Sequence, residues 1–482
     1  MDRHKIILVV ILVLAGGVRL WGLHISPPSL NWDEAALGYN AYSLWTTGQD
    51  EYGYRWPLSL RSFDDYKPPL YAYLTAPVVG IRGLNEFNTR FVSAVAGLGS
   101  VLLLYLITKK IAGEPEAIAA AGLAAVNPWS IYFSRGAFEA NLSLTLVLGI
   151  VYLVLNKKFL TAAILAGVNT LAYHSAKIYL WPILGWIGWK SRSGKVWLAM
   201  AAAIAIFSVP IWLGSGLARL RSTSILKLYR ETGSIYLFTG EIVNRYLSYF
   251  SPANLFVRGS NEPNQKVVGF APFYTWEVIV FVLGLGTILS KWQQNKFLLA
   301  GLAIAPLPAI ITWSWFAPIR VLPLLAGITI VNAIGIVSLW KKSQAITAGV
   351  GAWAIVQAIL FGLTIFIYSP YKDYGDWQWG FREVAAEIGL DWRKYDRIVW
   401  ETGQAQPYIF VLYYLKIPPA EYHQLLPRRD YDFGKFEFRK IYWPDDQNLK
   451  NTLFIGGVYS LPEGKEVIDP QGYVSARIWA TE

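Results

Sequence analysis

Long apolar stretches recur through the first 368 residues of this 482-residue chain, and they constrain its fold more than any other feature. A helix needs about 20 mostly apolar residues to cross a bilayer, and we expect about eleven such helices. They lie near residues 5–23, 91–108, 116–133, 140–156, 159–174, 178–189, 196–214, 275–290, 297–313, 320–340 and 344–368. Because spanning segments must satisfy their own backbone in lipid, this pattern predicts an all-α polytopic membrane domain.

The composition agrees with a lipid-facing surface. Hydrophobic residues make up 54% of the chain and charged residues only 16%, whereas soluble proteins carry about 25% charged residues. A net charge of +11 could suit nucleic acid, but much of it sits in short loops between apolar stretches, so we expect no nucleic-acid partner. The absence of cysteine excludes disulfides and thiolate chemistry.

Basic residues mark alternate loops. If the N-terminus is cytoplasmic, every inner loop carries at least two of them: Lys109/Lys110, Lys157/Lys158, Lys190/Arg192/Lys195, Lys291/Lys296 and Lys341/Lys342. The short loops of opposite parity carry one each, namely Arg135, Lys177 and Arg320. This positive-inside pattern predicts a multi-pass protein of the plasma membrane with its N-terminus inside. The first stretch could be a cleaved signal peptide, but its apolar character resumes through Leu23, which favours a retained signal anchor.

Three longer segments then lie outside: 24–90, 215–274 and 369–482. In the first, residues 35–45 and the stretch from Leu70 are expected to form amphipathic helices lying on the membrane. The composition changes after Ser369-Pro370, where 381–388 has helical character and three short apolar runs are typical of strands: 397–400, 408–412 and 452–455. We predict a transmembrane domain over 1–368 and a small extracytoplasmic α/β domain over 369–482.

Ionisable residues gather in the outer loops. Asp33 and Glu34 directly follow the first span, Tyr66 and Lys67 come later in the same loop, and the next outer loops supply Arg135, Glu139, His174 and Lys177. For the carboxylate pair alone, a helix-capping role is the commoner explanation, and the whole set could instead form interfacial salt bridges. Polar groups at membrane depth are nevertheless expensive and often functional.

Such a set suits glycosyl transfer from a phospholipid carrier. A carboxylate can accept the proton of an attacking hydroxyl, and cationic side chains can neutralise a phosphate leaving group. Carboxylates on different loops could also share a divalent cation, with Glu139 and Asp33 as candidate ligands. Adjacent helical side chains diverge by about 100°, so only one of Asp33 and Glu34 can face a given substrate atom while the other orients or caps.

Several short motifs resemble a known enzyme group. They are the carboxylate pair, Lys-Pro-Pro at 67–69, Glu-Phe-Asn-Thr-Arg at 86–90, the loop at 135–139, Tyr-Leu-Ser-Tyr-Phe-Ser-Pro at 246–252 and Pro-Ile-Arg at 318–320. In their order and common sidedness they resemble the protein O-mannosyltransferase and lipid A aminoarabinose transferase superfamily of GT-C fold glycosyltransferases. The resemblance covers most of residues 1–340. In the second outer loop this chain carries Glu139 where many relatives carry Asp.

The resemblance implies a polyprenyl-phosphate sugar donor, a lipid, glycan or protein acceptor, and inversion at the anomeric carbon. It gives the catalytic carboxylate position to Asp33, with Glu34 as its partner, and places Lys67 near the donor phosphate. Five further residues are candidates for donor binding: Tyr66, Arg135, His174, Lys177 and Arg320. The basic stretch Arg219, Arg221, Lys227, Arg230 and Arg245 could add a phosphate contact, and the sequence does not choose among its members.

Two other function classes compete with a glycosyltransferase. A transporter or flippase of lipid-linked sugar would place charges near the bilayer midplane and often shows repeated halves, but here the charges lie at one face and no internal repeat is detected. A non-enzymatic membrane scaffold leaves the cluster of outer charges unexplained.

The first prediction concerns sidedness. Because the paired basic residues lie in inner loops, protease added to right-side-out vesicles should digest the 369–482 segment, and an immunoblot against a C-terminal tag should show its loss. In inverted vesicles the tag should survive. Protection in right-side-out vesicles together with digestion in inverted ones would reverse the topology.

Overall fold

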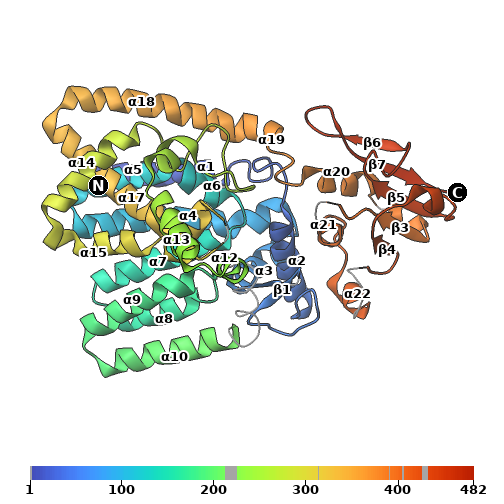
Figure 1. The fold of residues 1–482 in the computed structure, drawn as a ribbon, viewed down its shortest axis with the longest axis horizontal. Helices are drawn as coiled ribbons and strands as arrows, with labels where there is room; N and C mark the ends of the chain where they lie inside the picture. Colours follow the sequence, from blue (N-terminus) through green and yellow to red (C-terminus); the bar gives the residue numbers. More distant parts are fainter. Residues whose placement is uncertain are drawn as a thin grey trace. The chain divides into compact units, whose positions relative to one another are not determined.

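The computed structural model describes residues 3–63, 65–211, 225–312, 314–389, 391–403, 406–425 and 432–482. The chain forms two compact units (Figure 1). The helical unit comprises Met1–Trp21, Asp65–Leu70 and Val92–Thr364, and the mixed unit comprises Gly22–Asp64, Tyr71–Phe91 and Ile365–Glu482. The predicted end of one span at 214, and Arg219 and Arg221, lie outside the described residues.

The helical unit is built from apolar helices that follow the predicted stretches closely. The helices that contribute to it are α1 (Arg3–Leu20), α4 (Glu86–Ile111), α5 (Glu114–Val126), α6 (Pro128–Arg135), α7 (Glu139–Leu155), α8 (Phe159–Asn169), α9 (Ala176–Ser191), α10 (Gly194–Ile211), α12 (Leu226–Thr232), α13 (Ile235–Ser248), η2 (Asn254–Arg258), α14 (Glu277–Ser290), α15 (Trp292–Ile304), α16 (Leu307–Ile310), η3 (Pro318–Val321), α17 (Leu322–Lys342) and α18 (Gln344–Leu363). The short strand β2 (Asp65–Lys67) also belongs to this unit. The predicted helical fold class is therefore confirmed.

The number of membrane crossings stays a prediction. In the described part of the chain, three helices are long and apolar enough to cross a bilayer: Glu86–Ile111, Pro318–Lys342 and Gln344–Lys372. The pair Pro128–Arg135 and Glu139–Leu155 also meets these criteria as one span broken by a bend of 119°. The apolar helices Phe159–Asn169 and Glu277–Ser290 are shorter than these.

The mixed unit joins the first outer loop to the C-terminal segment. Its elements are α2 (Trp32–Thr47), β1 (Leu60–Ser62), α3 (Leu70–Arg82), η4 (Thr364–Tyr368), α19 (Ser369–Lys372), α20 (Trp379–Ile388), η5 (Asp391–Lys394), β3 (Arg397–Trp400), α21 (Pro407–Tyr414), α22 (Pro419–Gln424), β4 (Phe436–Phe438), α23 (Trp443–Asp446), β5 (Thr452–Gly456), β6 (Lys465–Ile468) and β7 (Val474–Ala480). The expected surface helix at 35–45 is α2, and the helix after Pro69 is α3.

A five-stranded mixed sheet organises the C-terminal part of this unit. Its order is β4-β3-β5-β7-β6, with β3 parallel to both β4 and β5 and with β7 antiparallel to β5 and β6. Val399 and Phe454 lie opposite each other in the β3–β5 register and pack with Ile441 and Leu461 in one hydrophobic cluster. The predicted α/β character of this segment is confirmed, with strands at 397–400 and 452–455 and a helix at 381–388.

One predicted strand is wrong. Residues 408–412 lie in α21, which begins at Pro407 and is buried from Pro407 through Tyr413. Proline suits the first turn of a helix because its missing N–H would have no partner there. A short run of apolar residues buried on all sides looks alike in sequence whether it is a strand or a helix.

Most of the outer loop 24–90 belongs to the mixed unit. Helix α2 packs against α21 and α22 inside the mixed unit, and ten of its sixteen residues are buried. The hydroxyl of Tyr39 on α2 donates to the carbonyl of Ile417, at 3.1 Å. Protein therefore covers much of the surface that the sequence assigned to a membrane-lying helix.

Two helices of the helical unit approach unusually closely. Helices α14 and α17 form its most extensive pair, and glycines line their contact. A Cβ at Gly284 would lie 2.0 Å from the carbonyl oxygen of Val331, and one at Gly335 would lie 1.8 Å from that of Val280. Small residues let two helix backbones come this close. In lipid, where no hydrophobic effect drives helices together, the resulting van der Waals packing stabilises the pair.

A buried polar cluster joins the same helices. Glu277, at the start of α14, accepts a hydrogen bond from Asn332 of α17 at 2.7 Å and one from Asn127 at 3.3 Å. Polar groups buried in a membrane protein require such partners.

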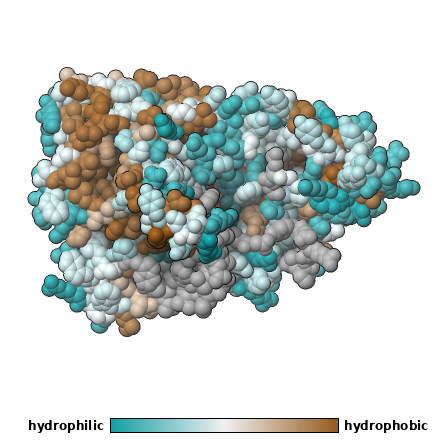
Figure 2. Space-filling model, viewed as in Figure 1, coloured by the Kyte–Doolittle hydropathy of each residue, from teal (hydrophilic) through white to brown (hydrophobic). Residues whose placement is uncertain are grey.

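Part of the outer surface of the helical unit is apolar. Figure 2 shows hydrophobic side chains gathered over α14 and α18, and Val282, Ile355 and Ile359 of these helices are exposed.

The glycine contact yields the second prediction. Gly284→Ala should lower the midpoint of thermal unfolding in detergent, because a methyl group cannot fit 2.0 Å from a carbonyl oxygen; overpacking typically costs about 1–3 kcal/mol. Gly286→Ala, on the same helix with nothing within 4 Å, is the matched control and should leave the midpoint unchanged or slightly raised. Equal midpoints for the two variants would show that α14 and α17 do not pack this way.

Candidate functional site

The carboxylate pair lies in the first turn of α2. Asn31 caps this helix: its side-chain oxygen accepts from the amide of Glu34 at 3.0 Å, while the Glu34 carboxylate accepts from the amide of Asn31 at 3.2 Å. This reciprocal capping box satisfies two backbone donors that would otherwise lack helical partners.

Glu34 also forms a buried ion pair with Arg90. The two guanidinium–carboxylate contacts measure 2.9 and 3.0 Å, and both side chains are at most 1% exposed. Arg90 further donates to the carbonyls of Leu23 and Pro27, at 2.7 and 2.9 Å, and to that of Ser29. The guanidinium thus holds the whole turn that leads into α2, with all its donors directed at fixed acceptors.

The two neighbouring carboxylates therefore differ in environment. Glu34 is buried, and its carboxylate is bonded to the helix cap and to Arg90. Asp33, in the same helical turn, is exposed. Arg90 lies in the Glu-Phe-Asn-Thr-Arg motif, but sequence reasoning gave it no role. The sequence did contain a sign of this role. Arg90 is a charged residue at the start of an otherwise apolar stretch, and a charge in that position requires a buried partner.

A second group of predicted site residues meets inside the helical unit. The backbone of 65–70 lies beside the turn before α9, where the amide of Leu70 donates to the carbonyl of Leu171 at 3.0 Å. His174 Nε2 lies 2.7 Å from the Tyr66 carbonyl oxygen, and the ammonium of Lys177 lies 3.4 Å from His174 Nδ1. The structure thus brings the segment of Tyr66 and Lys67 together with His174 and Lys177.

These contacts define the state of His174. A carbonyl can only accept, so Nε2 carries the proton, and Nδ1 is left to accept from Lys177. Both ring nitrogens of His174 thus have protein partners. His174 therefore orients the Lys177 ammonium, and it could bind phosphate or a metal only after giving up one of these contacts.

Arg320 lies in a neighbouring basic cluster. It donates to the hydroxyl of Thr312, and Arg245 donates to the carbonyls of Thr312 and Ser314 at 2.8 and 2.9 Å. Burial raises the pKa of the Tyr249 phenol, although the nearby Arg320 and Arg245 oppose the effect. Helix α16 contacts both α9, which carries Lys177, and η3, which carries Arg320.

Arg135 has a different placement. Its side chain is fully buried and donates to the carbonyls of Val18 and Trp21, at 2.6 and 2.8 Å, where α1 ends. Helix ends present carbonyls without helical partners and a negative dipole, which a guanidinium satisfies well. This geometry gives Arg135 a structural role, so it is not carried forward as a phosphate ligand.

The side chains do not form a metal site of the expected kind. Within the described residues, no group of three or more His, Cys, Asp or Glu side chains is placed to hold an ion. Glu139 is the first residue of α7, and Asp33 lies in the first turn of α2. Hard divalent cations take several oxygen ligands, so a cation at either residue would need ligands beyond that residue itself.

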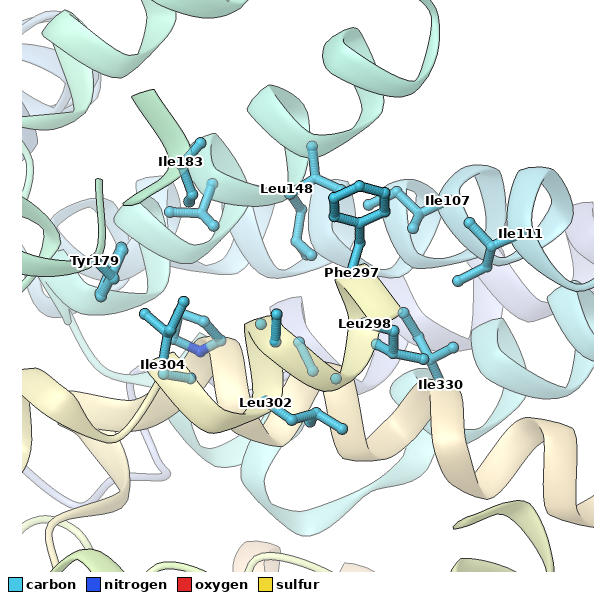
Figure 3. Close-up of a pocket in the computed structure, with 18 of the residues that line it drawn as sticks. Ile107, Ile111, Leu148, Tyr179, Ile183, Phe297, Leu298, Leu302, Ile304 and Ile330 are labelled. Carbon is cyan, nitrogen blue, oxygen red and sulfur yellow. The ribbon is translucent and has the colours of Figure 1, made fainter. Parts of the chain in front are cut away.

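An apolar cavity of about 460 Å³ lies in the helical unit between α4, α7, α9, α15 and α17 (Figure 3). Phe297, Leu298 and Leu302 of α15 line one side of it, and Ile107 and Leu148 lie across from them. Its lining is almost entirely aliphatic and aromatic, which suits hydrocarbon.

The cavity shares helices with the basic groups. Lys177 lies in the first turn of α9, and Tyr179 and Ile183 of that helix line the cavity. Arg320 lies in η3, directly before α17, and Pro323 and Ala326 of α17 line it as well. Lys177 and Arg320 therefore lie at the N-terminal ends of α9 and α17, and residues further along both helices line the apolar cavity.

Comparisons with known proteins agree with this description. Residues 66–212 match the sequence model of the dolichyl-phosphate-mannose-protein mannosyltransferase family. No curated protein matches the chain by sequence. Among solved structures, ArnT from Cupriavidus metallidurans in the apo state is 13% identical with a TM-score of 0.56, over 99% of this chain and 96% of that one.

Two further structures are similar. The same ArnT bound to undecaprenyl phosphate is 12% identical with a TM-score of 0.54, over 98% of this chain and 97% of that one. The archaeal oligosaccharyltransferase AglB from Archaeoglobus fulgidus is 14% identical with a TM-score of 0.48, over 86% of this chain, which spans only 63% of that protein. The chain therefore shares the fold of ArnT, as the resemblance of its motifs to the GT-C glycosyltransferases predicted.

Proposed function

We propose that this protein transfers a sugar from a polyprenyl-phosphate carrier to a hydroxyl acceptor at the extracytoplasmic face of the plasma membrane. The observation that carries the proposal is the apolar cavity of the helical unit, which adjoins helix ends bearing Lys177 and Arg320. A lipid phosphate has the matching chemistry: a hydrocarbon tail joined to an anionic head. The undecaprenyl phosphate bound by ArnT, which shares the fold, supports the same donor class.

The donor phosphate is held by Lys67, Lys177 and Arg320 in this proposal. The two lysines are nearly buried, each 8% exposed, so their charges are little screened by water and attract an anion more strongly than surface lysines do. His174 holds the Lys177 ammonium from the side of Tyr66. The polyprenyl tail extends along α9 and α15 into the cavity.

Asp33 acts as the general base. It accepts the proton of the acceptor hydroxyl while that oxygen bonds to the anomeric carbon, and the bond from this carbon to the phosphate oxygen breaks. The lipid phosphate leaves with its electron pair, and the lysines and Arg320 stabilise the charge that develops on it. A single displacement from the side opposite the phosphate inverts the anomeric carbon. Glu34 does not react because Arg90 and the helix cap occupy it.

The third prediction concerns donor binding. Lys67→Met and Lys177→Met should each weaken binding of undecaprenyl phosphate, by roughly 1.5–3 kcal/mol if one charge-assisted hydrogen bond is lost. Native mass spectrometry of the protein in detergent, titrated with this lipid, measures the effect. Lys341→Met, at an exposed end of α17, is the control and should bind normally. Wild-type affinity in both test variants would refute the phosphate site.

The fourth prediction separates the two carboxylates. Asp33→Asn should lower turnover roughly 10²–10⁴-fold, the usual contribution of a general base, without lowering the midpoint of thermal unfolding. Glu34→Gln should instead destabilise the protein, because removing one partner of a buried pair typically costs about 3–5 kcal/mol.

Turnover is measured as release of lipid phosphate from a panel of polyprenyl-phosphate sugars offered with acceptor-containing membrane extract. Normal turnover by Asp33→Asn would exclude it as the base. No release by the wild-type protein from any donor of the panel would count against the proposed donor class.

A further inference from the structure

The C-terminal segment reaches the start of α2 within the mixed unit. Gln378 Oε1 accepts a hydrogen bond from the amide of Trp32 at 2.7 Å. Trp32 is the first residue of α2, so its amide is one of the donors that a helix leaves without an internal partner. The cap from Asn31 serves Glu34 instead, and the partner for Trp32 comes from 346 residues further along the chain.

The backbone of Gln378 is in an unfavourable conformation. It has a φ of 53° and a ψ of 38°, in the left-handed region that favours glycine or asparagine. A residue with a longer side chain costs of order 1 kcal/mol or more there. Glycine at this position would remove the conformational cost. It would also remove the side-chain oxygen that accepts from the Trp32 amide, so the strained backbone is consistent with a need for the glutamine side chain.

Other contacts from the same segment reinforce this placement. The ring of Trp377 lies 5.6 Å from the guanidinium carbon of Arg90, and Arg382 donates to the carbonyl of Pro28 at 2.7 Å. Arg90 and residues 377–382 therefore both hold the turn that leads into α2.

Helix α21 adds a third set of contacts. The hydroxyl of Tyr414 lies 3.0 Å from the Ser29 hydroxyl and donates to the carboxylate of Glu86, also at 3.0 Å. Burial and the nearby Glu86 raise the pKa of Tyr414 well above its usual value, so the phenol keeps its proton and remains a donor. Tyr413 and Thr89 share a hydrogen bond of 2.7 Å.

These contacts bracket Asp33. Its predecessor Trp32 is tied to Gln378, and its successor Glu34 is tied to Arg90. We propose that Gln378 is a positioning residue, which sets the height and direction of the Asp33 carboxylate through the Trp32 amide. The C-terminal domain is then part of the catalytic apparatus rather than an appendage. This inference rests on the proposed role of Asp33 as the base.

The test compares four variants of the full-length protein: Gln378→Leu, Gln378→Gly, Gln378→Glu and, as a surface control in the same domain, Gln447→Leu. Gln378→Leu and Gln378→Gly lack the acceptor for Trp32 and should lower kcat about 10- to 100-fold, as expected when a catalytic group is slightly misplaced, with KM for the donor unchanged. Gln378→Glu keeps an acceptor oxygen and should recover most of kcat. The control should behave as wild type.

Hydrogen–deuterium exchange provides a readout that does not depend on activity. Peptides covering the start of α2 should exchange faster in Gln378→Leu and Gln378→Gly, while those from the sheet of β3, β5 and β7 stay protected. If Gln378→Leu fails to fold, Gln378→Gly decides, because glycine suits the left-handed backbone.

The outcomes separate this inference from the proposed function. Wild-type kcat in Gln378→Gly, in a protein whose Asp33→Asn variant is inactive, would overturn the positioning role and leave the base assignment intact. Unchanged exchange at the start of α2 in both test variants would overturn it as well. Normal turnover by Asp33→Asn would instead remove the proposed function on which the inference depends.

Discussion

Buried guanidinium groups that bind backbone carbonyls are the interaction on which the rest of the structure depends. Arg19, at the end of α1, donates to the carbonyls of Ala124 and Ala125 in the last turn of α5, at 2.8 and 3.2 Å. Arg135 does the same where α1 ends, and Arg90 does so for the turn before α2. A carbonyl that leaves a helix away from water costs free energy unless a donor meets it. Each arginine supplies several donors from one rigid plane, and so lets the chain turn sharply between elements.

This arrangement divides the proposed chemistry between the units. The helical unit offers what a lipid phosphate requires, an apolar cavity and two nearly buried lysines. The mixed unit offers an exposed carboxylate on a backbone fixed from both sides. Glu34 is paired with Arg90 and buried, whereas Asp33 in the same turn is exposed.

Local patterns predicted the helical fold, the positions of α2 and α20, and strands β3 and β5, because apolar periodicity and chain breaks are properties of neighbouring residues. Helix α21 was missed since complete burial removes that periodicity. Spacing indicated that Asp33 and Glu34 cannot both face one substrate atom, but the burial of Glu34 against Arg90, 56 residues away, could not be predicted from it. The placement of Arg135 and the contact of Gln378 likewise depend on partners distant in sequence, for which a single chain carries no local signal.

The interleaving of the mixed unit has a consequence for biogenesis. Its segment Gly22–Asp64 is synthesised before most helices of the helical unit, whereas Ile365–Glu482 is synthesised after them. The ion pair of Glu34 and Arg90 joins residues made close together in time, but the partner of the Trp32 amide is made much later. The contact between Gln378 and the Trp32 amide therefore cannot form until residues 365–378 have followed the helices of the helical unit out of the ribosome.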